Sequence, residues 1–362
     1  MKFCFILWTR PEIIKLFPLI KYAEDNNLNY FIIHTNQHYS ENMDKIFFKQ
    51  LNLKPAKYNL WINWWTHWQM TWKMMIEIEK VLLQEKPDIV FVQGDTNTVL
   101  AWWLVASKLW IKVAHVEAGL RSYDRTMPEE INRVVVDHLS EYLFCPTGKQ
   151  ANILINEWIE KNKIFVVWNT IVDAVFLVRE LAKSKEKEVL QKYWVAKNNY
   201  ILLTTHRPSN VDNKNNLRNL IEWILEIKKL SWKEILFPIH PRTKSNVIKF
   251  WLGYLLNYFK VIDPVWFFEN IVLEDNAYMI VTDSWWIQEE ACILKKKTLI
   301  LRENTERPET LEVGGAILVW NNKEKIIKWF IELENKRVNW YNPFGDGKSS
   351  KRIFKMILQS LS

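Results

Sequence analysis

The chain has 362 residues, of which 49% are apolar and 25% are charged, and its net charge is +8. This is the composition of a soluble globular protein, and the length suffices for two domains with separate cores. No apolar run approaches the roughly 18 residues of a membrane span, and the N-terminal stretch does not fit a signal peptide, so we expect a cytoplasmic protein without a membrane partner. Because the lysines are spread over amphipathic segments, the charge predicts a solvated surface rather than a nucleic-acid partner, and anionic substrates could account for part of it.

The first half of the chain alternates short apolar runs with amphipathic segments. Runs rich in β-branched and aromatic residues predict strands, and apolar residues at helical spacing predict helices. The predicted strands lie at 2–7, 30–35, 89–94, 113–118, 142–147 and 164–169, and the predicted helices at 13–25, 43–51, 70–86 and 98–109. Alternation of this kind predicts a parallel sheet that helices cover on both faces.

A second series of the same kind follows the charged stretch 183–199. Its predicted strands lie at 200–206, 234–240, 260–262, 278–284, 297–303 and 316–321. We therefore predict an α/β protein of two Rossmann-like domains, the first over residues 1–182 and the second over residues 183–345. Residues 346–362 are predicted to form a C-terminal helix that packs back on the first domain.

Polar side chains stand just past the ends of many predicted strands. Parallel α/β sheets bind their ligands at the carboxyl ends of the strands, so these side chains are candidates for a site. They mix cations with carboxylates, as a site for a phosphorylated substrate and acid/base chemistry would. The set is Thr9, Arg10, Glu12, Gln37, His38, Asp95, Thr96, Glu117, Arg121, His206, Arg207, His240, Arg242, Ser284, Arg302, Glu306 and Arg307.

Three motifs of the first half carry most of this expectation. TRPE at 9–12, with Lys15 one turn further on, places two cations at a helix N-terminus, where a phosphate would bind, although a surface turn would read the same way. Asp95 in QGDTNT is either a helix cap or a carboxylate of the site. Glu117 in HVEAGLRS ends the next strand, and two carboxylates at the ends of successive parallel strands can face one site.

The remaining motifs are weaker one by one. MPEEINR at 127–133 is explained by helix-dipole physics alone. THRPSN and FPIHPRT each place a His and an Arg after a strand of the second domain, which favours anion binding. Cys4, Cys145 and Cys292 are widely spaced and predicted to be reduced core residues. With no H-E-x-x-H and no Cys/His cluster, the sequence predicts no metal site.

Taken together and in order, these motifs resemble the non-hydrolysing UDP-N-acetylglucosamine 2-epimerase family. The resemblance runs from TRPEIIKL through GDTNT, HVEAGLRSYDRTMPEEINR, NTIVDA, THRP, HPRT, TDSWWIQEEA and RENTERPE to NPFGDGKSS. It implies two Rossmann-like domains of the glycosyltransferase-B type with the active site in the interdomain cleft. It also implies reversible conversion of UDP-GlcNAc to UDP-ManNAc, without a redox cofactor, by elimination and re-addition of UDP through 2-acetamidoglucal.

The resemblance assigns roles by motif position, without deciding which carboxylate moves which proton. It implies a catalytic set of Asp95, Glu117, Glu129, Arg133 and His206. It implies nucleotide or diphosphate contacts from Arg10, Lys15, Ser284, Trp285, Trp286, Glu290 and Arg307. Regulatory or substrate contacts are expected from Gln37, His38, His240 and Arg242, because some members bind a second UDP-GlcNAc. Members of the family are commonly homodimers.

Three rival functions remain open on the sequence. THWQMTWKM and RTMPEE also resemble the branch that epimerises UDP-2,3-diacetamido-2,3-dideoxyglucuronate, whereas ENTERPE favours UDP-GlcNAc. A glycosyltransferase could use the same fold, and it would release UDP only with an acceptor. A nonenzymatic nucleotide-sugar or nucleic-acid binder is the third, and the retained Asp95, Glu117 and Glu129 argue against it.

The chain holds 21 tryptophans and only 8 glycines, whereas glycine is normally about 7% of a protein. The family has glycine where this chain has Trp8, Trp168, Trp285 and Trp286. The stretch 61–72 holds five tryptophans here and has glycines in relatives. A turn that approaches a phosphate needs positive φ or no Cβ, and an indole would overpack it. We hypothesise that the source organism reads UGA as glycine and that its gene was translated with UGA as tryptophan. The alternative is a true tryptophan-rich protein with stacking surfaces for sugars or single-stranded nucleic acid.

Overall fold

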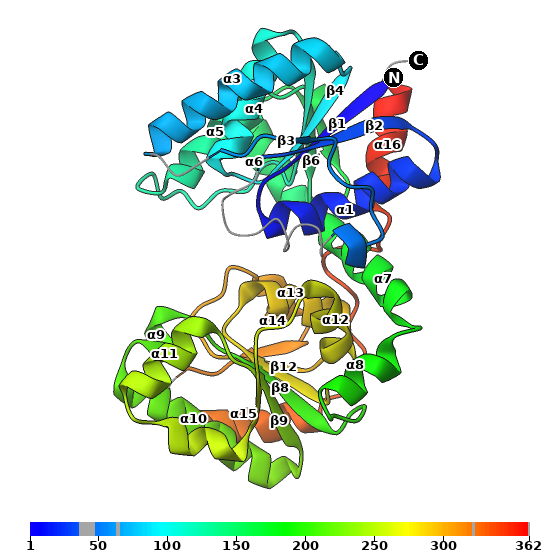
Figure 1. Cartoon of the computed structure of the whole chain (residues 1–362). Helices are drawn as coiled ribbons and strands as arrows, with labels where there is room; N and C mark the ends of the chain where they lie inside the picture. Colours follow the sequence, from blue (N-terminus) through cyan, green and yellow to red (C-terminus); the bar gives the residue numbers. More distant parts are fainter. Residues whose placement is uncertain (36–47, 63–65, 321–322, 361–362) are drawn as a thin grey trace. The chain divides into compact units, whose positions relative to one another are not determined.

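The computed structural model describes residues 1–35, 48–62, 66–320 and 323–360, with residues 67 and 323–325 described in the backbone alone (Figure 1). Its contacts divide the chain into two units. The first unit comprises Met1–Phe176 together with Phe344–Ser362, and the second comprises Leu177–Pro343. None of the described helices has an apolar stretch long enough to cross a bilayer.

The first unit is built on a parallel sheet with the strand order β3-β2-β1-β4-β5-β6-β7. The strands are β1 (Lys2–Leu7), β2 (Asn29–His34), β3 (Tyr58–Asn59), β4 (Ile89–Gln93), β5 (Lys112–Val116), β6 (Tyr142–Cys145) and β7 (Ile164–Val166). The helices are α1 (Arg10–Asp25), α3 (His67–Glu85), α4 (Asn97–Lys108), α5 (Pro128–Leu139), α6 (Gly148–Asn156), α7 (Thr170–Ala182) and α16 (Ser349–Gln359), with a 3₁₀ turn at Lys161–Lys163.

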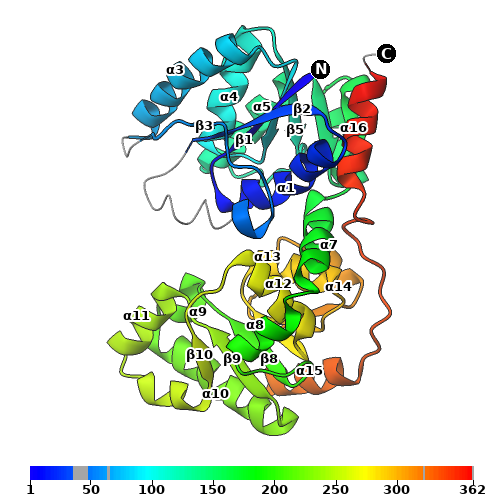
Figure 2. The same cartoon turned by 45° about the vertical axis from the view of Figure 1, so that its right-hand side comes forward.

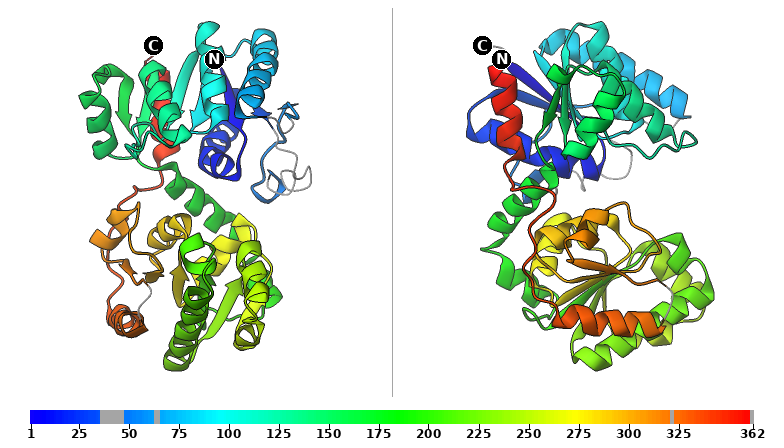
Figure 3. Two further views of the ribbon diagram at one scale, coloured as in Figure 1. Left: turned by 90° about the vertical axis from the view of Figure 1, so that its left-hand side faces the viewer. Right: turned by 180° about the vertical axis from the view of Figure 1, so that it is seen from behind.

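Alternation along β1 divides its side chains between two apolar layers. Cys4 and Ile6 belong to the cluster formed with α3, α4 and α5. Phe3 points to the other face and packs edge-on against Phe354 of α16, with ring centroids 5.4 Å apart. Figure 2 shows α1 and α16 side by side, and Figure 3 shows the red C-terminal helix against the blue N-terminal elements. The predicted parallel sheet with helices on both faces is therefore confirmed.

The second unit repeats the design with the strand order β10-β9-β8-β11-β12-β13, again all parallel. Its strands are β8 (Tyr200–Thr204), β9 (Glu234–Pro238), β10 (Lys260–Ile262), β11 (Met279–Thr282), β12 (Thr298–Ile300) and β13 (Ala316–Leu318). Its helices are α8 (Glu186–Lys192), α9 (Pro208–Val211), α10 (Lys214–Ser231), α11 (Pro241–Lys249), α12 (Phe267–Asn276), α13 (Trp285–Ile293), α14 (Pro308–Glu312) and α15 (Lys323–Asn335), with a 3₁₀ segment at Gly253–Tyr258. Both halves are therefore α/β, as the alternating pattern predicted.

The predicted boundary at 182/183 differs from the division that the contacts show, at Phe176/Leu177. The reason is that α7 begins in the first unit and continues into the second, so the charged stretch after it does not mark the boundary. The chain returns at Phe344, and Asp173 of α7 then holds the start of α16. Its carboxylate accepts the backbone N–H groups of Ser349 at 3.1 Å and Ser350 at 2.9 Å. The predicted helix at 43–51 lies largely outside the described residues.

Candidate active site

The loop after β1 is tied to the loop after β4 by one buried carboxylate, Glu12. Its Oε2 accepts the backbone N–H groups of Trp8 at 2.7 Å and Thr9 at 3.1 Å, and its Oε1 accepts the hydroxyl of Thr96 at 2.9 Å. Burial raises the pKa of Glu12 to about 7, although these hydrogen bonds act in the opposite direction. Arg10, predicted to contact the diphosphate, lies exposed at the first position of α1. The T-x-x-E spacing of a capping box was the sequence signal for this arrangement.

Glu117 stands at the end of β5 with both carboxylate oxygens engaged. Lys15 of α1 donates to Oε1 and Gln93, the last residue of β4, donates to Oε2. Lys15 and Glu117 are only 2% and 6% exposed, so water screens this ion pair weakly. Glu117 also has a φ of +67°, which is unusual for a residue with a side chain and typical of functional positions. The structure thus places Lys15 on a carboxylate of the predicted catalytic set.

Asp95 follows β4 and pairs with Arg133 of α5. The same guanidinium reaches Glu130 at 2.9 Å, and Asn132 donates to the Asp95 carbonyl at 2.8 Å. The bonds from Arg133 and Asn132 thereby fix the start of α5 to the loop that carries Asp95. Because β4 and β5 are hydrogen-bonded neighbours, Asp95 and Glu117 follow adjacent strands at one sheet edge, as their spacing predicted.

Glu130 was not predicted as a site residue, but it is the acid of the PEE motif that accepts hydrogen bonds from the 122–123 loop and pairs with Arg133. Burial acts to raise the pKa of Glu130, but the backbone N–H groups of Ser122 and Tyr123 and the charge of Arg133 lower it to about 2. The predicted catalytic residue Glu129 lies exposed in the first turn of α5. The two acids are adjacent in sequence, so the path of the 122–123 loop decides which carboxylate accepts its backbone N–H groups.

The corresponding edge of the second sheet is organised by Asp283, which is fully buried after β11. It accepts the hydroxyl of Thr205 at 2.7 Å and the backbone N–H groups of His206 and Arg207, each at 2.9 Å. Burial alone would raise the pKa of Asp283, but His206 and these hydrogen bonds hold it below its usual value. Asp283 was not among the predicted site residues, and its partners lie on the loop after β8.

His206 and His240, which follow β8 and β9, are brought together as expected, with ring centroids 5.3 Å apart. His206 also faces Asp283, with Nδ1 and Oδ1 3.2 Å apart. Burial and the neighbouring His206 lower the pKa of His240. Arg242, by contrast, turns to Asp212, with which it forms a two-point ion pair.

Ser284, Trp285 and Trp286 open α13, where the first turn of a helix leaves backbone N–H groups unbonded. The two indole rings lie 4.6 Å apart, and the guanidinium of Arg307 lies 4.7 Å from the Trp285 ring. Arg307 also pairs with Glu289. Glu290 is buried further along α13 beside Glu274, whose pKa is raised well above its usual value by burial and then by the charge of Glu290.

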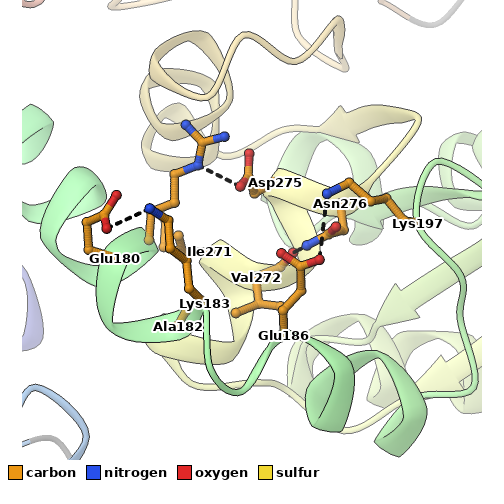
Figure 4. Close-up of a pocket in the computed structure, with 10 residues that line it drawn as sticks. Glu180, Ala182, Lys183, Glu186, Lys197, Ile271, Val272, Asp275 and Asn276 are labelled. Atoms are coloured by element: carbon orange, nitrogen blue, oxygen red, sulfur yellow. Dashed lines mark hydrogen bonds and ion pairs between the residues drawn. The ribbon is translucent and has the colours of Figure 1, made fainter.

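Several cavities lie among the described residues of the second unit. One of about 310 Å³ lies at the carboxyl edge of its sheet and is lined by Arg207, Pro208, Ser209, Arg302, Glu303, Asn304 and Trp320. Another, of about 360 Å³, lies near the start of β11, at the opposite edge (Figure 4). Its charged side chains pair with each other, for example Arg179 with Asp275 at 2.7 Å and Lys183 with Glu180 at 2.7 Å. Parallel α/β sheets bind their ligands at the carboxyl edge, so the cavity at that edge is the candidate for a ligand site.

The predicted contacts Gln37 and His38 lie outside the described residues. Within the part of the chain that the structure describes, no group of three or more His, Cys, Asp or Glu side chains could hold a metal ion. All three cysteines are buried and free.

Comparison with known proteins places this geometry in a family. The family model described as UDP-N-acetylglucosamine 2-epimerase matches residues 20–358. The curated UDP-N-acetylglucosamine 2-epimerase of Methanocaldococcus jannaschii is 58% identical over 361 residues, which cover 99% of each chain. A crystal structure of the M. jannaschii enzyme in complex with UDP-GlcNAc and UDP superposes with a TM-score of 0.82 at 57% identity and covers 99% of this chain and 100% of that one.

A relative with another substrate is more distant. The UDP-2,3-diacetamido-2,3-dideoxy-D-glucuronate 2-epimerase of Pseudomonas aeruginosa is 37% identical over 361 residues, covering 99% of each chain. The family model begins after β1 and the TRPE motif, whereas the M. jannaschii relative covers 99% of the chain. The chain belongs to the UDP-N-acetylglucosamine 2-epimerase family.

Proposed function

We propose that the chain interconverts UDP-N-acetylglucosamine and UDP-N-acetylmannosamine by inverting C2 of the sugar. The observation that carries this proposal is the pair of carboxylates at the ends of β4 and β5, each held by a cation: Asp95 by Arg133 and Glu117 by Lys15. The likeness to an enzyme whose structure contains UDP-GlcNAc supports the substrate.

The reaction needs a base because the C2 proton is only weakly acidic. In the forward direction a carboxylate takes that proton, the C1–O bond breaks with its electrons going to UDP, and a C1–C2 double bond forms in bound 2-acetamidoglucal. A second carboxyl then delivers a proton to the opposite face of C2, and the diphosphate oxygen returns to C1. Glu117 and Asp95, which Lys15 and Arg133 hold in place, supply one carboxyl for each proton transfer, and general acid–base catalysis of this kind contributes on the order of 10²–10⁴-fold.

The diphosphate would be recognised by the second unit. The first turn of α13 supplies backbone N–H groups, and Arg307 and His206 supply positive charge or donors near the same sheet edge. These contacts stabilise the charge that develops on UDP as the C1–O bond breaks. The assignments of Glu129, Glu290 and Arg10, and a site in the cleft between the domains, remain predictions of the family resemblance.

The test is proton exchange at C2 followed by NMR in deuterated water with no acceptor present. We expect UDP-GlcNAc to take up deuterium at C2 while UDP-ManNAc accumulates. Asp95→Asn and Glu117→Gln should each lower both signals by on the order of 10²-fold or more, while Lys108→Gln, an exposed residue at the end of α4, should leave them unchanged. Acceptor-dependent UDP release without exchange would favour a glycosyltransferase and contradict the proposal.

A second substrate deserves the same assay because the diacetamido-glucuronate epimerase of P. aeruginosa is 37% identical. The higher identity of 58% to a UDP-GlcNAc 2-epimerase makes UDP-GlcNAc our first choice. Faster exchange with UDP-2,3-diacetamido-2,3-dideoxyglucuronate than with UDP-GlcNAc would reverse that choice.

We also propose a homodimer in the cytoplasm. The outer face of α5 exposes Ile131, Val134 and Leu139, which no described part of the chain covers, and the buried, unpaired cysteines suit a reducing compartment. Light scattering on purified protein should give twice the chain mass. The double substitution Ile131→Asp and Val134→Asp should reduce it to one chain, and an unchanged mass would place the dimer interface elsewhere.

A further inference from the structure

Among the described residues, seven tryptophans adopt the left-handed backbone region: Trp61, Trp110, Trp158, Trp168, Trp194, Trp232 and Trp251, with φ between 47° and 71°. Steric contact with the Cβ disfavours this region for residues with a side chain, and a bulky residue there is a genuine outlier. Glycine adopts it freely. The repeated occurrence of tryptophan in this conformation therefore requires a physical cause.

Four of the seven end a helix in the same way. At the end of α4 the N–H of Trp110 bonds the carbonyl of Ser107 at 3.1 Å, and that of Ile111 bonds the carbonyl of Ala106 at 2.9 Å. The same two bonds recur around Trp158 after α6, Trp194 after α8 and Trp251 after α11. This is the Schellman motif, whose left-handed position is usually glycine.

The indoles at these positions gain nothing from packing. Trp110 is 93% exposed, Trp158 94% and Trp251 85%. No burial of apolar surface therefore offsets the backbone strain at these sites. The positions require a positive φ, and the side chain is incidental.

Two buried tryptophans are unfavourable for a different reason, an indole N–H that has no acceptor among the described residues. Trp102 and Trp103 lie inside α4, and within the described part of the chain neither Nε1–H finds an acceptor. Buried indole N–H groups normally have one, and leaving a donor unpaired costs about 1–3 kcal/mol. Trp285 and Trp286 occupy the first turn of α13, where an anion would approach the backbone N–H groups, and their rings lie 4.6 Å apart.

We infer that the working protein carries glycine, not tryptophan, at the left-handed positions and at the start of α13. The source that accounts for all of them is one codon, UGA, which the organism reads as glycine and another translation table reads as tryptophan. The eight glycines of the chain are then those written with ordinary glycine codons. Ser284 followed by two glycines would leave the N-terminus of α13 open to a diphosphate.

Peptide mass spectrometry of the protein isolated from its own organism tests this directly. We expect peptides that span positions 110, 158, 194, 232 and 251 to have the mass of glycine at each position. Tryptophan at any of these five positions would overturn the inference. Gene sequencing gives a second reading, since UGA codons are expected there and UGG codons would overturn it. Neither measurement depends on catalytic activity, so the proposed function and this inference can fail separately.

An independent observation concerns His115, a buried residue of β5 that lies between the two catalytic strand ends. Its Nε2 lies 2.9 Å from the carbonyl of Gly94, the residue before Asp95, and its Nδ1 lies 2.7 Å from Asp137 of α5. Both ring nitrogens therefore lie within hydrogen-bond distance of an oxygen, and the orientation of the ring is fixed from both sides. The ring thereby connects the Asp95 loop to α5.

Asp137 extends this connection to the loop after Glu117. It accepts the backbone N–H of Gly119 at 3.0 Å and the guanidinium of Arg121 at 2.7 Å, and Arg121 pairs with Glu157. Burial alone would raise the pKa of Asp137, but His115 and Arg121 keep it below its usual value. Gly119 has no room for a Cβ, which would stand 2.6 Å from the carbonyl oxygen of Gln150, so this loop has one tight path.

We infer that His115, with Asp137, is a positioning residue that sets the separation of Asp95 and Glu117. The inference rests on the proposed function. A misplacement of about 1 Å costs a reaction of this kind on the order of 10²-fold in rate. The expected signature of His115→Phe is therefore a kcat lower by that order, with KM for UDP-GlcNAc changed less than about threefold.

The experiment compares three variants in the enzyme that shows C2 exchange. His115→Gln, whose amide can still donate to the Gly94 carbonyl, should recover part of kcat, and Lys108→Gln, an exposed residue at the end of α4, should match the parent. Unchanged kcat in folded His115→Phe would overturn the inference. An inactive parent would instead count against the proposed function.

Discussion

Replacing tryptophan by glycine at two helix ends should stabilise the first unit, which is the reverse of what large-to-small substitutions usually do. The change is the double variant Trp110→Gly and Trp158→Gly in the chain as printed. Both residues close helices of the first unit in the left-handed conformation, with φ of 58° and 66°. Both side chains are exposed, so their removal uncovers almost no core.

The magnitude follows from two opposing contributions. The left-handed conformation costs an L-residue about 1–2 kcal/mol. Glycine removes that strain but gives the unfolded chain more freedom, which costs about 0.5–1 kcal/mol. The net gain is about 0.5–1 kcal/mol at each position, and about 1–2 kcal/mol for both. For a domain of this size the melting temperature should rise by about 2–4 °C for each kcal/mol.

Trp72→Gly is the matched control. Trp72 is also an exposed tryptophan of the first unit, but it lies inside α3 in ordinary helical conformation. Glycine in a helix interior is less favourable than most residues by about 0.5 kcal/mol, so this variant should be slightly destabilised. Both variants replace exposed tryptophan by glycine, so the sign of the change in unfolding free energy distinguishes them.

Urea and thermal unfolding followed by circular dichroism give the comparison, because removing indoles would change a fluorescence signal. The reasoning would be refuted if the double variant lost stability to the same degree as Trp72→Gly. That result would mean that the indoles at 110 and 158 make stabilising contacts that exceed the cost of the backbone conformation.

Three further predictions concern buried carboxylates. Because burial raises the pKa of Glu12 from 4.5 to about 7, the folded chain binds more protons than the unfolded chain between those pH values, and its stability should fall as the pH rises through them. Glu12→Gln should reduce this loss of stability, measured by urea unfolding at pH 5 and pH 8. An equal loss in the variant and the parent would contradict the prediction. Asp173→Asn should cost about 1–3 kcal/mol by weakening the attachment of α16, measured as lower hydrogen-exchange protection in that helix, while unchanged protection would contradict the role. Asp283→Asn should lower the melting temperature of the second unit and weaken UDP binding in calorimetry, because an amide cannot accept from every N–H group that now converges there; binding and melting equal to the parent would refute it.

The sheets could be predicted because their signal is local. The run 2–7 is apolar from Phe3 to Leu7, as a strand buried on both faces must be, and its predicted bounds are those of β1 in the structure. The parallel order followed from helices lying between strands. The placing of Asp95 and Glu117 on one edge followed from the same rule, since adjacent strands bring their carboxyl ends together.

The partners of the site residues could not be predicted because they are distant in sequence. Lys15 and Glu117 are 102 residues apart, and nothing around Lys15 indicates that its ammonium turns inward to a carboxylate rather than outward to a phosphate. The choice of Glu130 over Glu129 depends on the loop at 122–123. Asp283 was not predicted as a site residue, because the loop after β8 that carries its partners comes next to it only once the second sheet is formed.

The position of α16 has a consequence for how the chain is made. Phe354 of this helix is fully buried against Phe3, Phe91 and Tyr22, with ring centroids 5.4, 5.7 and 4.9 Å apart. The aromatic side chains of the sheet synthesised first therefore lack the cover of Phe354 until α16, Ser349–Gln359, has been added. Domains generally fold as units during synthesis, so the second unit is complete while the first still waits for its closing helix. A ribosome-bound chain that stops before Ser349 should consequently hold a folded second unit and a first unit that attracts chaperones.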